Sequence, residues 1–287
     1  MNVTRKAGTI FTAALLANTF IASIALTGCK ADSASQHAES MGKVSDRPAT
    51  PPEVAPRANV GAPDATPSQG PTGNISGTVS FAGTLPKYPV IDTAMDPACS
   101  LGKATSTLPV EQIEVTKGKL SNVFLFVKTG PPAAMQAGAT TKQPVVMDQQ
   151  GCRYVPHVIG VMAGGYVEFR NGDPTMHNIH TMPTDVGNET IDVSMGPRGK
   201  AMTKQFVKPE LMIPLRCNNH PWMNAFINVS ATPFFAVSDA NGHFDLQGLP
   251  VGEYTLGAVQ EKLGEQDLHV TVAANGTAKA GFTFSSK

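Results

Sequence analysis

The chain has 287 residues, of which 22 are Lys or Arg and 22 are Asp or Glu, so its formal net charge is zero. A nucleic-acid-binding domain carries a basic excess, and this balance argues against that class. The length suits one large domain or two ordinary ones of about 100–200 residues each. Four cysteines are too few for a disulfide-dense scaffold, but they allow one disulfide and one thiolate ligand. Seven histidines limit the number of metal centres that the chain can build.

The first 28 residues have the pattern of an export signal. Arg5 and Lys6 precede an apolar stretch at 10–26, and small residues follow it before Cys29. Such a segment is removed on export and is excluded from fold reasoning. The run Leu-Thr-Gly-Cys that ends at Cys29 resembles the bacterial lipobox, which implies that Cys29 is acylated and becomes the first mature residue. An ordinary signal cut elsewhere, or an uncleaved anchor, is the alternative.

The lipid predicts a place in the cell envelope. Multiple acyl chains anchor a protein stably to a membrane. Lys30 follows Cys29, and the absence of an Asp there favours the periplasmic face of the outer membrane, with the cell surface and the inner membrane as alternatives. Residues 29–72 are expected to form a disordered tether, because residues 30–72 contain seven prolines and no Leu, Ile or aromatic residue.

Beyond residue 73, short runs of alternating apolar and polar residues predict β-strands. Runs such as 75–81, 158–161, 226–229 and 268–272 are bounded by Gly, Pro, Asn or Asp. No window of a dozen residues keeps an apolar period of 3.6, so long helices are not expected. Many short strands separated by turns indicate an all-β fold of sandwiches or barrels.

The strongest chemical signal is the run Cys-Asn-Asn-His-Pro-Trp-Met at 217–223, which follows His177 by about 40 residues. A tight loop at the end of a strand can place Cys217, His220 and Met223 around one ion, and His177 can close the other side. Two imidazoles, a thiolate and a weak axial thioether are the ligands of electron-transfer copper. A buried thiol with a core methionine, or a zinc site at the Cys-x-x-His part, is the alternative.

Two other histidines are weaker ligand candidates. His180 lies three residues after His177, so in an extended strand it points to the opposite face. His157 follows a proline in an expected strand. The sequence therefore predicts one copper ion bound by His177, Cys217, His220 and Met223, with His180 and His157 outside the site.

These residues resemble the cupredoxin family, whose pattern is a loop ending in His-Asn and then Cys-x₂-His-x₂-Met in the contracted form seen in amicyanins. The resemblance covers about residues 144–232 and includes the stretch 154–171, which is similar to the strand pair before the first histidine. It implies a Greek-key β-sandwich over residues 136–232 with one type 1 copper. It also implies that Asn178 hydrogen-bonds between the two ligand loops and that His220 shows an imidazole edge to solvent as the electron port.

Trp222 and Pro221 lie beside His220 in the loop. A large apolar ring next to a metal-bound imidazole suits a docking patch for a redox partner protein. Shielding of the copper from water is the alternative function of the ring.

Cys99 and Cys152 are left when Cys29 is assigned to the lipid and Cys217 to the metal. Two leftover cysteines usually pair in an oxidising compartment. Their loop of about 54 residues would contribute about 4 kcal/mol by the chain-entropy relation. Two independent buried thiols are the alternative.

The C-terminal part resembles the carboxypeptidase regulatory-like, or prealbumin-like, β-sandwich. Its D-x-x-G-x-F hairpin and following L-P-x-G-x-Y-x-L pattern match residues 239–244 and 249–256, and Gly77-Thr78-Val79 is similar to its opening. We therefore expect a discontinuous sandwich of residues 73–135 and 233–287 with the copper domain of residues 136–232 inserted. The alternative is an extended cupredoxin that includes the early strands.

The expected function is that of a lipid-anchored, single-electron copper carrier without enzymatic activity. Its expected partners are a redox protein of the envelope and the membrane, with no nucleic acid. Storage or delivery of copper is the alternative, because five methionines lie near the ligand loops and methionine is a soft Cu(I) ligand; core packing explains them more simply. They are Met176, Met182, Met195, Met202 and Met212.

Overall fold

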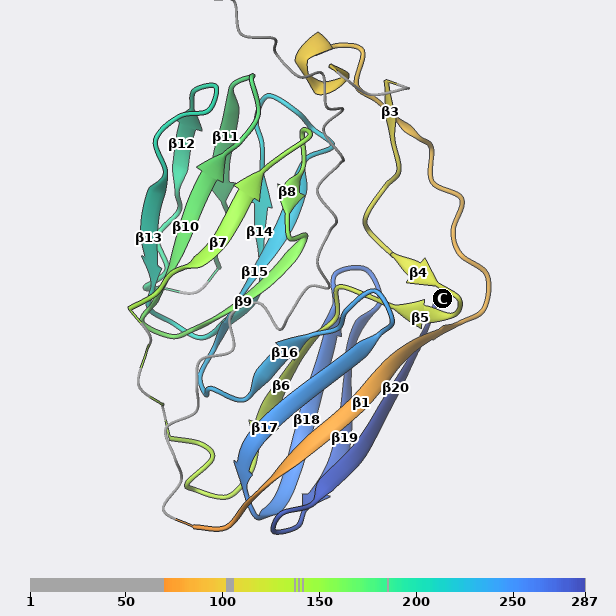
Figure 1. Cartoon of the computed structure of the whole chain (residues 1–287), viewed down its shortest axis with the longest axis vertical. Helices are drawn as coiled ribbons and strands as arrows, with labels where there is room; N and C mark the ends of the chain where they lie inside the picture. Colours follow the sequence, from red (N-terminus) through yellow and green to blue (C-terminus); the bar gives the residue numbers. More distant parts are fainter. Residues whose placement is uncertain are drawn as a thin grey trace, which may run out of the picture. The chain divides into compact units, whose positions relative to one another are not determined.

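The computed structural model describes residues 70–286, apart from 102–105, 137, 139, 141 and 185 (Figure 1). Within these residues the chain forms twenty strands and one short 3₁₀ helix, η1, which spans Pro97–Cys99. The predicted all-β class is confirmed. No helix among the described residues has the length and apolar character needed to cross a bilayer. The predicted signal at 1–28, the predicted acylation of Cys29 and the predicted tether up to residue 69 lie outside the described residues.

Two sheets combine strands from both ends of the described chain. One sheet has the order β17-β1-β5-β4, with β20 also paired to β1, and the other has the order β16-β6-β18-β19. In Figure 1, β1 (orange) and β20 (dark blue) lie side by side, and they pair in parallel from Asn74–Thr277 to Ala82–Ser285. The strands are β1 (Thr72–Ala82), β4 (Val115–Thr116), β5 (Lys119–Leu120), β6 (Phe124–Thr129), β16 (Phe235–Val237), β17 (His243–Pro250), β18 (Gly252–Gln260), β19 (Gly264–Val272) and β20 (Thr277–Ser285).

The alternating pattern of these strands turns one set of side chains inward. Ile75 and Val79 of β1, Leu256 of β18 and Phe282 of β20 are buried in one hydrophobic core. Strand β1 is central in its sheet and pairs with β5, β17 and β20. This pairing fixes the ends of the described chain to one another.

Residues 145–230 form two further sheets with their own core. One sheet has the order β13-β10-β7-β8, and the other has the order β12-β11-β14-β15-β9. The core between them contains Met147, Phe169, Ile179, Ile213 and Ile227. The strands are β7 (Val145–Gln149), β8 (Tyr154–Val155), β9 (Val158–Met162), β10 (Gly165–Asn171), β11 (His177–Thr181), β12 (Asp192–Met195), β13 (Met202–Phe206), β14 (Glu210–Arg216) and β15 (Asn224–Ser230). The sheet pairings keep this block separate from the strands on either side of it in the chain, while the exact domain boundaries stay a prediction.

A small cluster joins the two sets of sheets. Phe124 of β6 and Phe235 of β16 pack with Val158 and Met162 of β9. The backbone of β9 passes close to these rings, since a Cβ added at Gly160 would lie 2.7 Å from both aromatic side chains. Glycine at this position therefore permits the close approach.

A long connection between β1 and β4 carries a separate two-stranded pair, β2 (Ile91–Asp92) with β3 (Thr107–Leu108). We call residues 91–101 the strap; it contains β2 and η1. Asp96 caps η1, because its carboxylate accepts the N–H of Ala98 at 2.9 Å, and Pro97 begins the helix. The strap is the part of this connection that reaches the candidate site.

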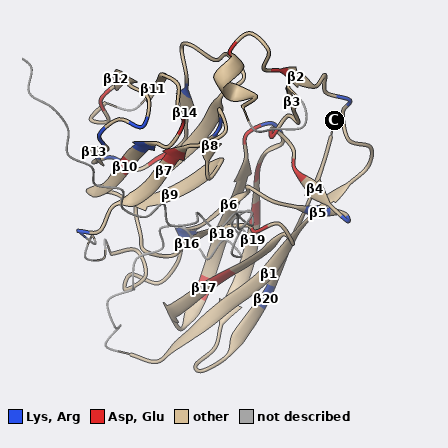
Figure 2. Cartoon of the chain, turned by 45° about the horizontal axis from the view of Figure 1, so that its top comes forward, with Lys and Arg blue, Asp and Glu red and all other residues tan. Residues whose placement is uncertain are grey.

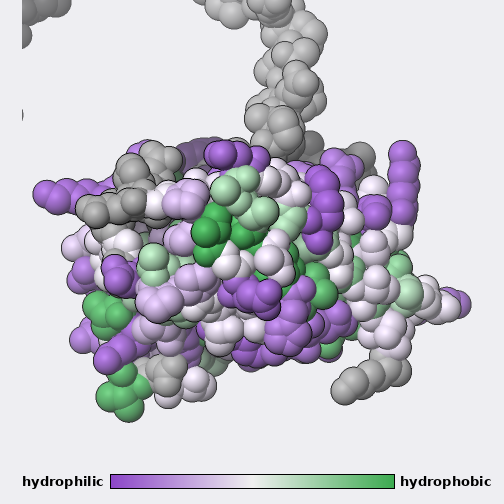
Figure 3. Space-filling view, turned by 90° about the horizontal axis from the view of Figure 1, so that it is seen from below, coloured by the Kyte–Doolittle hydropathy of each residue, from purple (hydrophilic) through white to green (hydrophobic). Residues whose placement is uncertain are grey.

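Charged residues of both signs are interspersed over the described chain (Figure 2). Lys128, for example, lies 2.7 Å from Glu265 and 2.8 Å from Asp267. On the face seen in Figure 3, hydrophobic side chains gather in a small area bordered by hydrophilic ones.

Candidate metal centre

The ligand candidates come from two neighbouring strands. His177 is the first residue of β11, and Cys217 follows the last residue of β14. These strands are antiparallel, with His180 opposite Arg216, so the start of β11 lies beside the end of β14. The loop from β14 to β15 is closed by backbone hydrogen bonds from Cys217 N to Met223 O and from Met223 N to His220 O, at 3.2 and 2.9 Å.

Three predicted ligands converge on one point. His177 Nδ1 and His220 Nδ1 are 3.0 Å apart, and His220 Nδ1 is 3.5 Å from Cys217 Sγ. The donor atoms of the three residues all lie within 4.8 Å of one another. First-row ions bind nitrogen and sulfur at about 2.0–2.3 Å, which separates neighbouring donors by about 3.3–3.8 Å. The two distances from His220 Nδ1, to His177 Nδ1 and to Cys217 Sγ, are therefore within a few tenths of an ångström of the separation that one ion requires.

Met223, the fourth predicted ligand, is buried in the same core as Cys217. Its position in the loop is fixed by the two backbone hydrogen bonds described above. The structure thus places all four predicted ligands in one short hairpin and the adjacent strand end.

The surroundings of Cys217 favour its thiolate form. Burial opposes its ionisation, but hydrogen bonds with His177 and His220 and from the backbone N–H groups of Asn178 and Asn219 lower the pKa of Cys217 to about 6. The Asn178 N–H lies 3.4 Å from the sulfur. Metal ligation requires the thiolate, and the surrounding donors favour that form.

Each imidazole predicted to be a ligand has a carboxylate on its other nitrogen. His177 Nε2 is 2.8 Å from Asp173 Oδ2, and His220 Nε2 is 2.9 Å from Asp96 Oδ2. When Nε2 donates its proton to a carboxylate, Nδ1 is left as the metal-binding atom. Burial acts against a charged His177, but hydrogen bonds to Asp173 and Cys217 raise its pKa to about 9. The pKa of His220 is also raised, by Cys217 and Asp96 against the effect of burial.

Further hydrogen bonds hold the two carboxylates. Asp173 accepts the backbone N–H of Gly151 at 2.6 Å and that of Cys152 at 2.7 Å. Asp96 accepts the hydroxyl of Thr175 at 2.9 Å. Asp96 and Asp173 were not predicted as site residues. For Asp173 the sequence does hold a local signal, since it ends the Asn-Gly-Asp run four residues before His177. For Asp96 it holds none, because His220 lies 124 positions later in the chain.

The prediction that an imidazole edge of His220 faces solvent is wrong. His220 is only 3% exposed. Asp96 lies against its Nε2, and Cys99 Sγ is 3.6 Å from the same atom. The strap therefore covers the imidazole edge that the cupredoxin resemblance predicted to face solvent.

The side chain of Asn178 was predicted to hydrogen-bond between the two ligand loops, and it makes this link through Asp192 rather than directly. Its side-chain Nδ2 donates to Asp192 at 2.9 Å, and Asp192 also accepts Asn218 Nδ2 at 3.2 Å. The side chain of Asn178 thus reaches the Cys217 loop through Asp192, while its backbone N–H contacts the sulfur directly.

Cys99 and Cys152 form a disulfide, with their Cα atoms 5.4 Å apart. Cys217 is a free, buried cysteine.

His180 lies outside the converging donors and bonds through Nδ1 to Asn218 at 2.9 Å. His157 is buried elsewhere, with Nε2 2.6 Å from Glu261.

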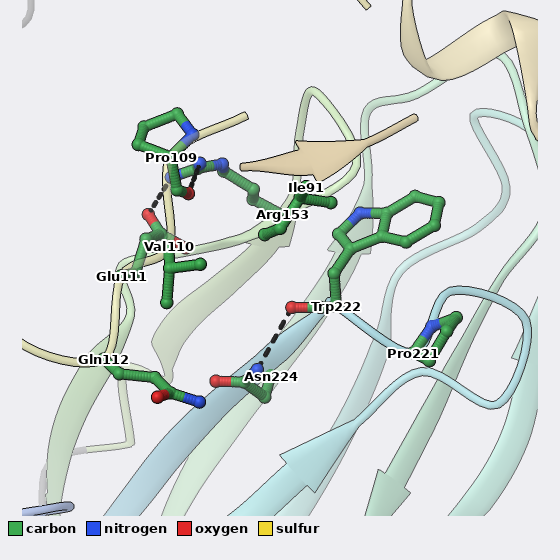
Figure 4. Close-up of a pocket in the computed structure, with 9 residues that line it drawn as sticks. All are labelled: Ile91, Pro109, Val110, Glu111, Gln112, Arg153, Pro221, Trp222 and Asn224. Atoms are coloured by element: carbon green, nitrogen blue, oxygen red, sulfur yellow. Dashed lines mark hydrogen bonds and ion pairs between the residues drawn. The ribbon is translucent and has the colours of Figure 1, made fainter. Parts of the chain in front are cut away.

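Trp222 is half-buried and packs on the ligand imidazole. Its ring centroid is 5.1 Å from that of His220, and its Nε1 donates to the carbonyl of Cys152 at 3.2 Å. With Pro221 it lines two cavities. One, of about 150 Å³, has Trp222 and Pro221 on one side and Arg153 with its Glu111 partner on the other (Figure 4).

The second cavity, of about 320 Å³, lies at His220. Trp222 and Pro221 line it together with Asp96, Met95 and Met176. Both methionines are exposed, at 91% for Met95 and 49% for Met176. This cavity therefore brings an indole and two exposed thioethers next to the buried imidazole of His220.

No family model and no curated protein matches the chain. Among solved structures, a Cu-containing nitrite reductase from Thermus scotoductus SA-01 is 26% identical over 33% of this chain and 24% of its own, with a TM-score of 0.29. A mutant of amicyanin in its Cu(I) form is 17% identical over 37% of this chain and 98% of its own, with a TM-score of 0.28. A purple cupredoxin from Nitrosopumilus maritimus is 21% identical over 30% of this chain and 98% of its own, with a TM-score of 0.25. The chain spans about a quarter of the length of the nitrite reductase.

Proposed function

We propose that this protein binds one copper ion and transfers single electrons, without enzymatic activity. The observation that carries the proposal is the convergence of His177 Nδ1, His220 Nδ1 and Cys217 Sγ in a buried site, with Met223 in the same loop. Thiolate, two imidazoles and a weak thioether form the type 1 copper ligand set. Copper bound there would supply a centre that accepts and donates one electron.

The residues around the site suit this role because they keep the ligands in place. Asp173 and Asp96 orient the two imidazoles, and the Asn178 N–H contacts the sulfur. Burial of His177, Cys217 and Met223 excludes water. A ligand set that is held in one arrangement needs little rearrangement when one electron is gained or lost.

We place this carrier in the cell envelope, held by a lipid on Cys29 on the periplasmic face of the outer membrane. The signal pattern of residues 1–29 supports this part of the proposal. The proposed partner is a redox protein that docks near Trp222 and Pro221. Both residues line the cavity at His220.

Copper loading of the purified full chain tests the function. We expect an intense thiolate-to-copper absorption band in the visible spectrum of the oxidised protein, and we expect Cys217→Ser to lose it. The matched control is His180→Gln, because His180 lies on the same strand but outside the converging donors. Absence of the band from the wild-type protein would refute the proposal, as would its persistence in Cys217→Ser.

A second candidate function is the storage or delivery of copper, favoured by the exposed methionines at the second cavity. Thioethers are soft ligands that select Cu(I), and their unbranched side chains adapt to an incoming ion. Titration with Cu(I) separates the two functions, since a carrier takes up one ion and a handling protein takes up more. Any additional uptake should fall in the double variant Met95→Leu/Met176→Leu and persist in the control Met135→Leu, whose methionine is also exposed.

A further inference from the structure

The strap meets the candidate metal centre at two residues. Asp96 Oδ2 lies 2.9 Å from His220 Nε2, and Cys99 Sγ lies 3.6 Å from the same nitrogen. The strap contacts His220 at Nε2, whereas Cys217 faces Nδ1 on the other side of the same ring. It therefore closes the outer side of the centre without using the metal-binding atom.

The disulfide links this contact to the other ligand imidazole. Cys99 is bonded to Cys152, whose backbone N–H donates to Asp173 Oδ2 at 2.7 Å. The same carboxylate oxygen lies 2.8 Å from His177 Nε2. One disulfide thus connects the two carboxylates that hold the two imidazoles.

The strap has few other attachments. Of residues 91–101, Thr93 and Cys99 are buried, and the rest are exposed or half-buried. Thr93 bonds to Ser106 within the same connection. The strap is held on the site by the disulfide and by the hydrogen bonds of Asp96 to His220 and Thr175.

We propose that Asp96 and the Cys99–Cys152 disulfide form a clasp over the centre that controls how fast the metal leaves. Asp96 is a positioning residue in this clasp, because it acts on the metal through His220. The inference rests on the proposed copper function and adds to it a control of the rate at which the metal leaves the site. Release requires a ligand imidazole to swing out and a competing ligand to enter, and the clasp opposes both movements.

The disulfide acts on this opening through chain entropy. Without the cross-link, the strap is the middle of a long connection with few buried contacts, so its locally open state becomes more populated. Without the Asp96 carboxylate, His220 loses a charge-assisted hydrogen bond that holds its ring. Either change is expected to speed metal release by about tenfold or more, the size typical of losing a group that orients a metal ligand.

The test measures transfer of Cu(I) from the loaded full chain to an excess of a coloured Cu(I) chelator. We expect Cys99→Ser/Cys152→Ser and Asp96→Asn to release copper at least about tenfold faster than wild type, and Thr175→Val to release it faster as well. The matched control is Asp92→Asn, because Asp92 is an exposed carboxylate on the same strap that bonds to the backbone N–H of Ala94. It should release copper at the wild-type rate.

The oxidised form of each variant is checked for the thiolate-to-copper band and its electron-spin spectrum. A changed electron-spin spectrum in Asp96→Asn, but not in Asp92→Asn, would support positioning of His220. If the disulfide variant does not fold, Asp96→Asn and Thr175→Val still decide the question. Wild-type release rates in variants that keep the band would overturn the clasp, whereas a wild type without the band would overturn the copper proposal itself.

Discussion

Replacing Asp173 by Asn should weaken the fold around the candidate metal centre even when no metal is present. The carboxylate accepts three hydrogen bonds, from Gly151 N, Cys152 N and His177 Nε2, at 2.6, 2.7 and 2.8 Å. Its side chain is 10% exposed, so water cannot replace these donors readily. An amide at this position keeps one acceptor oxygen, which can serve Cys152 N and His177 Nε2, and turns an N–H₂ group toward the N–H of Gly151.

The size of the effect follows from the bonds lost. A hydrogen bond to a charged group contributes about 1.5–3 kcal/mol. Oδ2 of Asp173 accepts both Cys152 N and His177 Nε2, whereas Oδ1 accepts Gly151 N, so an amide with its oxygen at the Oδ2 position loses one bond and leaves the other two without a charged acceptor. We therefore expect the free energy of unfolding of the metal-free protein to fall by about 2–4 kcal/mol. Asp148→Asn is the control, since this half-buried carboxylate of β7 accepts the N–H of its own neighbour Gln149, and it should cost less than about 1 kcal/mol.

The difference between wild type and Asp173→Asn also depends on pH. The pKa of Asp173 is lowered, because hydrogen bonds with His177 and from Cys152 and Gly151 outweigh the effect of burial. The contribution of the Asp173 carboxylate to the free energy of unfolding is therefore lost as the pH falls below the ordinary pKa of an aspartate. The pKa of His177 is raised from 6.5 to about 9, so its contribution is complete below 6.5 and is lost as pH rises toward 9. The difference should be largest between about pH 4 and 6.5.

Guanidinium unfolding of the metal-free chain measures this prediction, with the fluorescence of Trp222 as a reporter beside the site. A loss below 1 kcal/mol, or a difference that grows from pH 6.5 to 9, would refute the assignment of Asp173 as a charged acceptor for His177.

Three further predictions concern other parts of the molecule. In the metal-free protein, ultraviolet thiolate absorbance should titrate near pH 6 and be missing from Cys217→Ser; a midpoint at the ordinary thiol pKa of about 8.5 would contradict the hydrogen bonding described here. Gly160→Ala should lower the free energy of unfolding by about 1–3 kcal/mol, because the new Cβ would lie 2.7 Å from Phe124 and Phe235; an unchanged denaturation midpoint would show that the two rings can move apart. Lys128→Met should change the free energy of unfolding by less than about 1 kcal/mol, since its two partner carboxylates on β19 are 35% and 45% exposed. A larger change, measured by thermal unfolding, would argue that these charges form a buried ion-pair network.

The all-β class could be predicted from the sequence because strand formation follows local alternation. The burial of β20, for example, alternates from Thr277 to Ser285 as its apolar residues do. The grouping of Cys217, His220 and Met223 could also be predicted, because the three residues share one short loop whose hydrogen bonds need no distant partner. Their meeting with His177 requires only that two strand ends lie side by side.

The tertiary structure decided what surrounds those ligands. Asp96 and His220 lie 124 positions apart, and their contact depends on the path of the strap and on the disulfide to Cys152. Local spacing carries no information on such a path, because it is set by the packing of residues that are distant in the chain. For this reason the burial of His220 and the two carboxylates on the ligand imidazoles emerged only when the chain was folded.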